Sequence, residues 1–323
     1  MRLLKLVPDN TNIDFMRWRN VALVLSTLLT LAAMALVFTR GLNLGVDFVG
    51  GQSVRVTFAQ PPALDELRNH VEQVVEGATI QQRGGNTVYE IRTPLPEGGE
   101  AGANQAATRL RADITQRYPG ARFDAVQTVS GKVSSELFRS GSLAVGLAML
   151  GIAIYIWIRF EWQFGVGALV TLFHDVWMTM GLFSLTQIEF NLNVIAAILT
   201  IVGYSLNDTV VIYDRIRENL RKFRKMEIVP LLNLSLNETL SRTMVTSLSI
   251  LMALLALLLL GPDVIIGLTI AIFFGIFVGT YSSIYVSSPV LVALGVTTGS
   301  FLPSDPKVRA AEGPRNENFG AKV

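Results

Sequence analysis

The sequence contains no cysteine, which excludes disulfide bonds and thiolate metal sites. It is also poor in charge, because only 16% of its 323 residues are Asp, Glu, Lys or Arg, against about 25% in soluble domains. A nucleotide-binding loop is missing as well, since Gly131-Lys132-Val133 lacks both the upstream glycine and the following Ser or Thr of that motif. An ordinary soluble domain is therefore excluded, and we expect neither ATP hydrolysis nor a bound metal or cofactor.

Half of the residues are hydrophobic, and the mean hydropathy is +0.45. Apolar runs close to the roughly 20 residues that cross a bilayer recur at residues 20–38, 142–158, 164–185, 193–213, 243–260 and 264–295. Ala33-Met34-Ala35 has the form of a signal-peptide cleavage site, but the first run continues through Phe38, so we interpret it as a retained anchor. These runs predict an α-helical polytopic membrane protein with about six transmembrane helices.

Basic residues gather before the first run, after the fourth run and in the tail. Such clusters mark the cytoplasmic side of a membrane protein, and an even number of spans places all three on that side. The predicted organisation is a cytoplasmic N-terminus (1–19), a first helix (20–38), an outer domain (39–140), a five-helix bundle (141–297) with a basic cytoplasmic loop (214–240), and a cytoplasmic tail (298–323).

The outer domain shows both strand and helix periodicity. Residues 53–58 and 87–92 alternate as half-buried strands do, with a shorter candidate at 79–82 and a last strand at 122–129. Helical spacing of apolar residues follows the first strand and recurs around Leu110, whereas residues 94–104 have the composition of a loop. The order β-α-β-β-α-β is typical of a small α+β ferredoxin-like domain. We interpret this domain as a platform for contacts, because it shows no catalytic constellation.

Asp208 lies inside the fourth apolar run, where a carboxylate costs roughly 2.5–3.5 kcal/mol on insertion scales. Arg242 stands at the head of the fifth run, and His174-Asp175 lie within the third. Helical spacing aligns Tyr204 with Asp208 and Thr246 with Arg242. We therefore predict an ion path through Asp208 and Arg242, with further candidate members His174, Asp175, Asn207, Tyr204 and Thr246.

The two charged groups suggest a switch. Burial favours the neutral form of an aspartate, whereas a nearby arginine favours the ionised form, so protonation of Asp208 would be coupled to helix position. A proton crossing about 100 mV releases roughly 2.3 kcal/mol. Simpler interpretations remain: Arg242 snorkelling to lipid headgroups, Asp208 serving as a structural hydrogen-bonding residue, and His174-Asp175 forming a local packing pair. Gly275 and Gly279 add a G-x-x-x-G spacing of low specificity in the last run.

Several motifs resemble those of one family. Residues 45–51, Gly-Val-Asp-Phe-Val-Gly-Gly, resemble the glycine-rich signature of the SecD/SecF protein-export family. Residues 203–219, 239–243 and 173–176 are similar to the fourth-, fifth- and third-helix motifs of its SecF members. The resemblance covers about residues 10 to 300, in order and with the helix layout of the family.

The resemblance implies an accessory, non-enzymatic subunit of the bacterial Sec translocase in the inner membrane. SecF members pair with SecD in a twelve-helix assembly related to resistance-nodulation-division transporters. They associate with the SecYEG channel, with YajC and YidC as further partners, and use the proton gradient to draw the translocating polypeptide outward; nucleic acid is not a partner. Asp208 and Arg242 match the positions implicated in proton passage. The outer domain would be periplasmic, with a signature at Gly45, Asp47, Gly50 and Gly51.

Three other functions are compatible with the pattern to different degrees. Half of a proton-driven exporter of small molecules or lipids would need a substrate-sized outer cleft. A passive membrane scaffold would need no ion flow. An intramembrane aspartyl protease could use Asp175 and Asp208 as a pair sharing a proton, but Ser205-Leu206-Asn207 is not the glycine pattern of such proteases.

Overall fold

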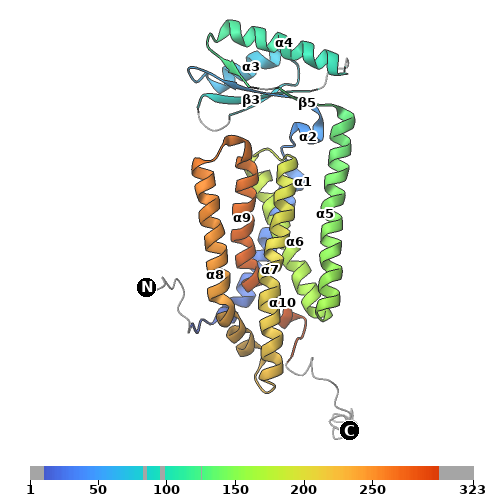
Figure 1. Ribbon diagram of the computed structural model, residues 1–323, viewed down its shortest axis with the longest axis vertical. Coiled ribbons are helices and arrows are strands. Elements are labelled where there is room, and N and C mark those ends of the chain that lie inside the picture. Colours follow the sequence, from blue (N-terminus) through green and yellow to red (C-terminus); the bar gives the residue numbers. More distant parts are fainter. Residues whose placement is uncertain (1–10, 83–85, 95–98, 125, 298–323) are drawn as a thin grey trace, which may run out of the picture.

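The computed structural model describes residues 11–82, 86–94, 99–124 and 126–297. A bundle of long helices forms one part of the molecule, and a sheet covered by two helices is stacked on one end of it (Figure 1). The ends of the chain at 1–10 and 298–323, which we predict to be cytoplasmic, lie outside the described residues.

Six helical segments of the described chain are long and apolar enough to cross a membrane, which confirms the predicted number. They are α1 (Arg19–Arg40, preceded by the 3-10 turn η1, Phe15–Trp18), α5 (Gly131–Arg159), α6 (Trp162–Thr186), α7 (Leu192–Lys222), α8 (Ile228–Leu260), and a final segment. That segment follows the 3-10 turn η2 (Asp263–Ile265) and runs from α9 (Ile266–Ser282) through the π-helical η3 (Ser283–Ser287) into α10 (Ser288–Ala293).

The helices are longer than the apolar runs. The segment predicted as a basic cytoplasmic loop at residues 214–240 is helical for most of its length, because α7 continues to Lys222 and α8 already begins at Ile228. Arg, Glu, Leu and Lys are good helix formers, so the helices extend beyond the apolar segment that hydropathy detects. Only residues 223–227 connect the two helices.

The most buried helices of the bundle are α6, α7 and α9, while α1, α5 and α8 expose broad apolar faces. On the α1–α6 interface, a Cβ added at Gly181 would lie 2.4 Å from the Cβ of Ala33. Glycine at this position therefore permits the close approach of the two helices. One apolar core lies toward the sheet, around Phe183 and Ile198, and another lies toward the opposite end, around Phe164 and Tyr213.

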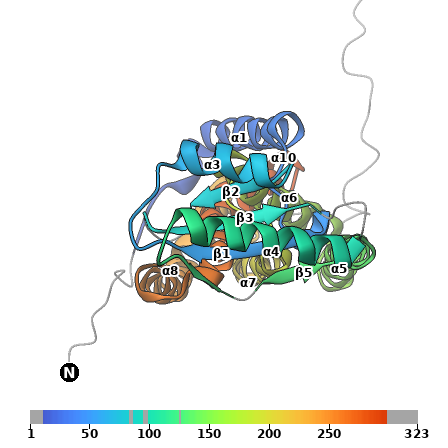
Figure 2. The same ribbon diagram turned by 90° about the horizontal axis from the view of Figure 1, so that it is seen from above.

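The sheet domain contains β1 (Gly51–Thr57), α3 (Leu64–Val74), β2 (Thr79–Gln82), β3 (Val88–Thr93), α4 (Gly99–Arg117), β4 (Arg122–Phe123) and β5 (Gln127–Val129), and a short helix α2 (Val46–Val49) precedes it. The strands are antiparallel in the order β2-β3-β1-β4, and β5 also pairs with β1. Both helices lie on the sheet face away from the bundle (Figures 1 and 2). Leu67, Val71, Leu110 and Ile114 fill the core between these helices and the sheet.

Two local predictions for this domain are wrong. The loop predicted at residues 94–104 gives way to α4 at Gly99, because the Ala, Glu and Gln residues that follow favour helix despite the glycines among them; residues 95–98 lie outside the described part. The single strand predicted at 122–129 consists of β4 and β5. Their pairings with β1 differ by one residue in register, as an inserted residue in a strand produces.

Candidate functional site

Asp208 lies inside the bundle, on the face of α7 directed to α8 and α9. Its side chain is 3% exposed, and Oδ2 is a buried acceptor with no hydrogen-bond partner. Arg242 is exposed on α8, and the structure contains no ion pair between these two described residues. The guanidinium therefore acts on the carboxylate only through space. An unpaired buried acceptor is energetically costly, so this carboxylate is held where a bound proton would remove part of the cost.

Ser247 of α8 connects the helices beside Asp208. Its Oγ accepts hydrogen bonds from the Tyr204 hydroxyl of α7 at 3.0 Å and from Thr280 Oγ1 of α9 at 2.8 Å. Its own proton remains to be donated, and the Asp208 carboxylate is its neighbour. Tyr204, Asp208, Ser247 and Thr280 form the Asp208 cluster. The sequence prediction contained two of these residues and missed Ser247 and Thr280.

Asp175 forms a second centre on α6. The side chain is fully buried: Oδ1 lies 2.9 Å from His174 Nδ1, while Oδ2 accepts from Ser205 Oγ at 2.5 Å and from Ser282 Oγ at 2.9 Å. His174, Asp175, Ser205 and Ser282 form the Asp175 cluster, which joins α6, α7 and α9. These hydrogen bonds offset the cost of burying a carboxylate.

Gly279 explains how α9 comes so close to the Asp175 cluster. A Cβ added there would lie 3.3 Å from the Cβ of Ser205 and 3.6 Å from Asp175 Oδ2. One turn earlier, a Cβ at Gly275 would lie 2.4 Å from Ile201 Cδ1. The G-x-x-x-G spacing therefore marks a genuine close contact between α9 and α7. Immediately after Ser282 the helix becomes π-helical, a local change that is frequent at functional sites.

Two of the predicted path residues are exposed, although Thr246 also lies beside the Tyr204 hydroxyl. Asn207 is exposed on α7. Thr246 is exposed on α8, where its Oγ1 bonds to the backbone oxygen of Arg242 at 2.9 Å. The polar face that α8 buries is instead the one carrying Thr239, Thr243 and Ser247. On α6, Thr171, Asp175 and Thr179 lie one helical turn apart and are all buried.

The glycine-rich signature lies at the junction of the bundle and the sheet domain. Gly45 N–H donates to Phe190 O at 2.9 Å, and a Cβ added at Gly45 would meet Glu189 Oε1 at 2.5 Å. Asp47 Oδ2 accepts the N–H of Leu192 at 3.0 Å, which satisfies an otherwise free donor at the start of α7. Gly50 and Gly51 have positive φ angles of 74° and 120°, which favour glycine.

Arg92 of β3 holds the same junction together and was missed by the sequence prediction. It forms an ion pair with Glu189 of the α6–α7 loop at 3.0 Å, and the Arg92 side chain is 10% exposed. Its Nη1 also donates to Asn43 Oδ1 at 3.1 Å and to Leu44 O at 3.3 Å. Asn43 and Leu44 lie in the connection between α1 and α2, and Glu189 lies in the loop between α6 and α7. The Arg92 side chain therefore links the sheet to both of these segments. Arg92 and Glu189 are far apart in the sequence, so no local sequence pattern predicts that they pair.

The described residues contain no group of three or more His, Asp or Glu that could hold a metal ion. The chemistry available in the two clusters is therefore that of carboxyl, hydroxyl, phenol and imidazole groups. Carboxyl groups can exchange protons, and hydroxyl groups can pass them along hydrogen bonds. The arrangement supports proton binding and transfer between helices.

Comparison with known proteins gives consistent matches. The family described as protein export membrane protein SecD/SecF, C-terminal, matches residues 111–297, and the SecD/SecF GG motif matches residues 35–62. The chain is 42% identical to protein translocase subunit SecF of Cereibacter sphaeroides, over 98% of this chain and 99% of that protein. It is 40% identical to SecF of Rickettsia rickettsii, over 89% of this chain and 94% of that protein.

Solved structures agree with these matches. The crystal structure of SecDF, a translocon-associated membrane protein from Thermus thermophilus, aligns with a TM-score of 0.82 and 36% identity over 90% of this chain. A second SecDF structure, in a super-membrane-facing form, aligns with a TM-score of 0.67 and 35% identity over 94% of this chain. The chain spans 40% of each SecDF chain. The resemblance seen in the sequence is confirmed: this multi-pass membrane protein belongs to the SecD/SecF family of protein export membrane proteins.

Proposed function

We propose that this chain is an accessory subunit of a protein translocase, which works with a SecD partner and uses the proton motive force to promote polypeptide export through the SecYEG channel. The observation that carries the proposal is the match to SecF subunits along 99% and 94% of their length. The chain accounts for 40% of the SecDF chains, so a SecD subunit would supply the remainder. YajC and YidC are further proposed partners.

In this proposal Asp208 is the proton carrier and Arg242 is the group that responds to its charge. The burial of Asp208, its unpartnered Oδ2 and its neighbour Ser247 support the first role. When Asp208 is neutral, no net charge on its carboxyl group attracts the Arg242 guanidinium. When it is ionised, α7 and α8 are drawn together, because attraction between opposite charges is strong away from water. A membrane potential of about 100 mV supplies roughly 2.3 kcal/mol per proton, enough to shift such an equilibrium.

The Asp175 cluster is proposed as the second part of the proton path. Ser205 lies on the same helix as Asp208 and donates a hydrogen bond to Asp175. A movement of α7 therefore changes the surroundings of Asp175 and of Asp208 at the same time. His174, only 5% exposed and bonded to Asp175, would exchange a proton with it. Asn207 would enter the path only after the helices rotate, whereas Thr246 already lies beside the Tyr204 hydroxyl.

Movement of α6 and α7 would reach the sheet domain through the Arg92–Glu189 ion pair and the Asp47 cap. We interpret this domain as ferredoxin-like, which the antiparallel order β2-β3-β1-β4 and the two helices on one face support. Its role would be to contact SecD or the emerging polypeptide.

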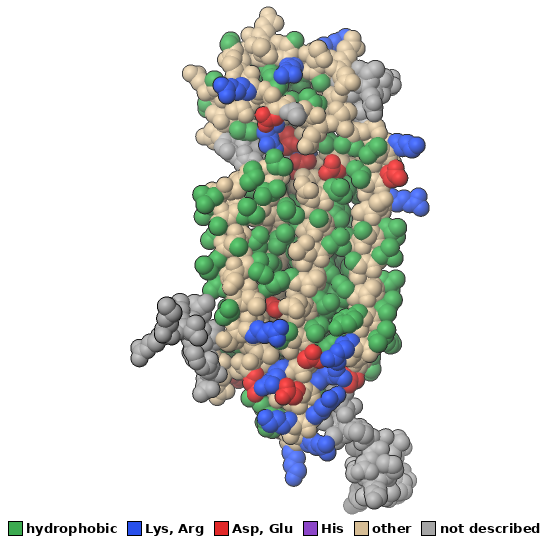
Figure 3. Space-filling model, viewed as in Figure 1, with side chains coloured by type: hydrophobic (Ala, Val, Ile, Leu, Met, Phe, Trp, Pro, Cys, Tyr) green, Lys and Arg blue, Asp and Glu red, His purple; other side chains and the backbone are tan. Residues whose placement is uncertain are grey.

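The orientation we propose places the sheet domain in the periplasm and both termini in the cytoplasm, across a bacterial inner membrane. Lys and Arg side chains gather at the end of the bundle opposite the sheet domain, below a band rich in hydrophobic side chains (Figure 3). Such a bias marks the cytoplasmic side.

Export into inverted membrane vesicles tests the proposal. Vesicles carrying SecD and the Asp208→Asn variant should show normal export with ATP alone and lose the additional export that a proton gradient supports. Glu227→Gln, at the exposed start of α8, is the matched control and should behave as the unmodified chain. Gradient-dependent export that survives Asp208→Asn would favour the passive scaffold.

Arg242→Lys separates the two interpretations of the arginine. A snorkelling arginine tolerates lysine, whereas a partner that engages the carboxylate with its planar fork does not. We expect a clear loss of gradient-dependent export with no change in the amount of folded protein.

A further inference from the structure

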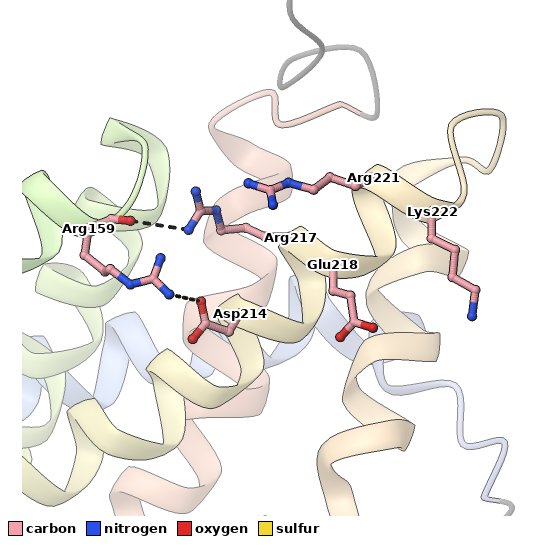
Figure 4. A pocket seen from close by; sticks show the side chains of 6 residues that line it. All are labelled: Arg159, Asp214, Arg217, Glu218, Arg221 and Lys222. Carbon is pink, nitrogen blue, oxygen red and sulfur yellow. Dashed lines mark hydrogen bonds and ion pairs between the residues drawn. The ribbon is translucent and has the colours of Figure 1, made fainter.

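An open cavity of about 430 Å³ lies at the end of the bundle opposite the sheet domain. The residues lining it come from the end of α5 and the last turns of α7 (Figure 4): Arg159, Asp214, Arg217, Glu218, Arg221 and Lys222. Four of these six side chains are basic and two are acidic, so the cavity has an excess of positive charge. The proposed proton path does not use this cavity.

Both acidic groups already have partners. Asp214 Oδ1 pairs with Arg159 Nη2 at 3.1 Å, and Glu218 Oε2 pairs with Arg215 Nη1 at 2.7 Å. Within the described chain, Arg221 and Lys222 form no ion pair, and both are exposed. Arg221 is therefore free to meet a ligand, whereas the Lys222 ammonium lies 5.0 Å from the ring centroid of Phe223 and has no carboxylate partner among the described residues.

The remaining arginines are held in place by an aromatic ring and by carboxylates: Arg159 pairs with Asp214, and Arg217 Nε lies 3.3 Å from Glu161 Oε2. Arg159 and Arg217 lie 5.1 and 5.2 Å from the ring centroid of Phe160, which is 5% exposed. Arg217 Nη1 also donates to Arg159 O at 3.3 Å. Arg221 stands one helical turn beyond Arg217, and Figure 4 shows both side chains directed toward the end of α5. Preorganised guanidinium groups are well suited to phosphate oxygens.

Helix dipoles oppose anion binding here, but they are weaker than the side-chain charges. The C-termini of α5 and α7 end at Arg159 and Lys222, and each contributes about half a negative charge. The N-terminus of α6 at Trp162 contributes about half a positive charge, which offsets one of these two. The net dipole contribution is thus roughly half a negative charge, against two unpaired cations.

Side chains suited to the bilayer boundary stand close in sequence to Arg159, which lines the cavity. Trp157 and Ile158 at the end of α5 are 70% and 81% exposed, and Trp162 at the start of α6 is 53% exposed. Tryptophan prefers the membrane interface, and these residues lie within three positions of Arg159 in the sequence. A ligand that has both a phosphate and acyl chains satisfies both surfaces, which inorganic phosphate alone does not.

We propose that this cavity binds the phosphate of an anionic phospholipid headgroup, with Arg221 as the principal contact, Arg159 and Arg217 as the preorganised wall, and Lys222 as an additional positive charge at the edge of the cavity. The acyl chains lie against Trp157 and Trp162. The bound lipid then holds together the ends of α5 and α7 at the membrane surface.

The test uses the full chain in phosphatidylcholine nanodiscs, with Trp18 and Trp177 replaced by Phe so that Trp157 and Trp162 are the remaining tryptophans. Quenching of their fluorescence by dibrominated phosphatidylglycerol is compared with quenching by dibrominated phosphatidylcholine. Arg221→Gln/Lys222→Gln removes two positive charges from the cavity. Arg224→Gln/Lys225→Gln is the matched control, because it removes the same charge from the neighbouring exposed loop outside the cavity.

We expect the cavity variant to lose about tenfold in preference for phosphatidylglycerol, since each basic group near the surface contributes to anionic lipid binding, while the control changes less than about twofold. Equal losses in the two variants would show nonspecific surface attraction and overturn the proposal, as would no loss in either. Inorganic phosphate at constant ionic strength should not reduce the preference; a reduction at millimolar concentration would assign the cavity to a soluble phosphate instead.

Discussion

The Ser205 hydroxyl of α7 donates to Asp175 of α6 across 2.5 Å, three residues before Asp208 on the same helix. One helix therefore contacts both buried acids. A rotation of α7 that changes the surroundings of Asp208 must also stretch or break the Ser205–Asp175 hydrogen bond. The two carboxyl groups are mechanically coupled even though no hydrogen bond among the described residues joins their clusters.

Replacing Asp175 by Ala should destabilise the bundle by about 2–5 kcal/mol, because it leaves several polar groups buried without their partner. Titration with a denaturing detergent, followed by circular dichroism, measures the change. Asp214→Ala, which breaks a half-exposed pair with Arg159, is the control and should cost less than about 1 kcal/mol. Equal effects would show that the Asp175 cluster does not stabilise the fold.

Two glycine substitutions on membrane helices should have opposite outcomes. Gly181→Ala forces a Cβ to within 2.4 Å of the Cβ of Ala33, so it should separate α1 from α6 and destabilise the protein by about 1–3 kcal/mol. At Gly146 of α5 an added Cβ meets nothing within 4 Å. Gly146→Ala should therefore be neutral or stabilise by up to about 1 kcal/mol. Thermal unfolding of both variants in the same detergent is the measurement, and a stable Gly181→Ala protein would contradict the close packing of α1.

Arg92→Gln should loosen the junction between the sheet domain and the bundle. Removing one partner of a buried ion pair costs about 3–5 kcal/mol, and here the lost contacts reach both Asn43 and Glu189. Hydrogen exchange should rise selectively at the α1–α2 connection and the α6–α7 loop. Arg68→Gln, which breaks an exposed pair with Asp65, should leave exchange at these sites unchanged. Unaltered exchange in Arg92→Gln would mean that other contacts hold the junction.

The sequence predicts the helices and strands well where the signal is local. Hydropathy identifies six spans, and alternation identifies the strand and helix order of the sheet domain. It fails at helix ends, because residues 214–222 continue α7 after the apolar signal stops. It also fails at α4, where the glycines in residues 94–104 suggest a loop although the neighbouring residues favour a helix. The residue composition of these segments is compatible with either a helix or a loop, and packing in the folded protein determines which of the two forms.

The candidate site could be predicted only in part, for a related reason. Buried acids within apolar runs are conspicuous, so Asp175 and Asp208 are found from sequence alone. The rotation of α8 is not, because its apolar residues surround the helix and do not mark an inner face. Thr246 is predicted because it lies one turn after Arg242, whereas the structure buries Ser247. Ser282 and Arg92 act through partners more than 40 residues away in the chain, at Asp175 and Glu189. Such contacts depend on the folded topology.

The central claim is that Asp208 binds and releases a proton inside the bundle. Infrared difference spectroscopy of the protein with SecD in lipid, recorded as pH is changed, observes carboxyl protonation directly. We predict a band of a protonated buried carboxyl that is absent in Asp208→Asn and retained in Asp214→Asn. A spectrum that is identical in the unmodified chain and in Asp208→Asn would contradict the account.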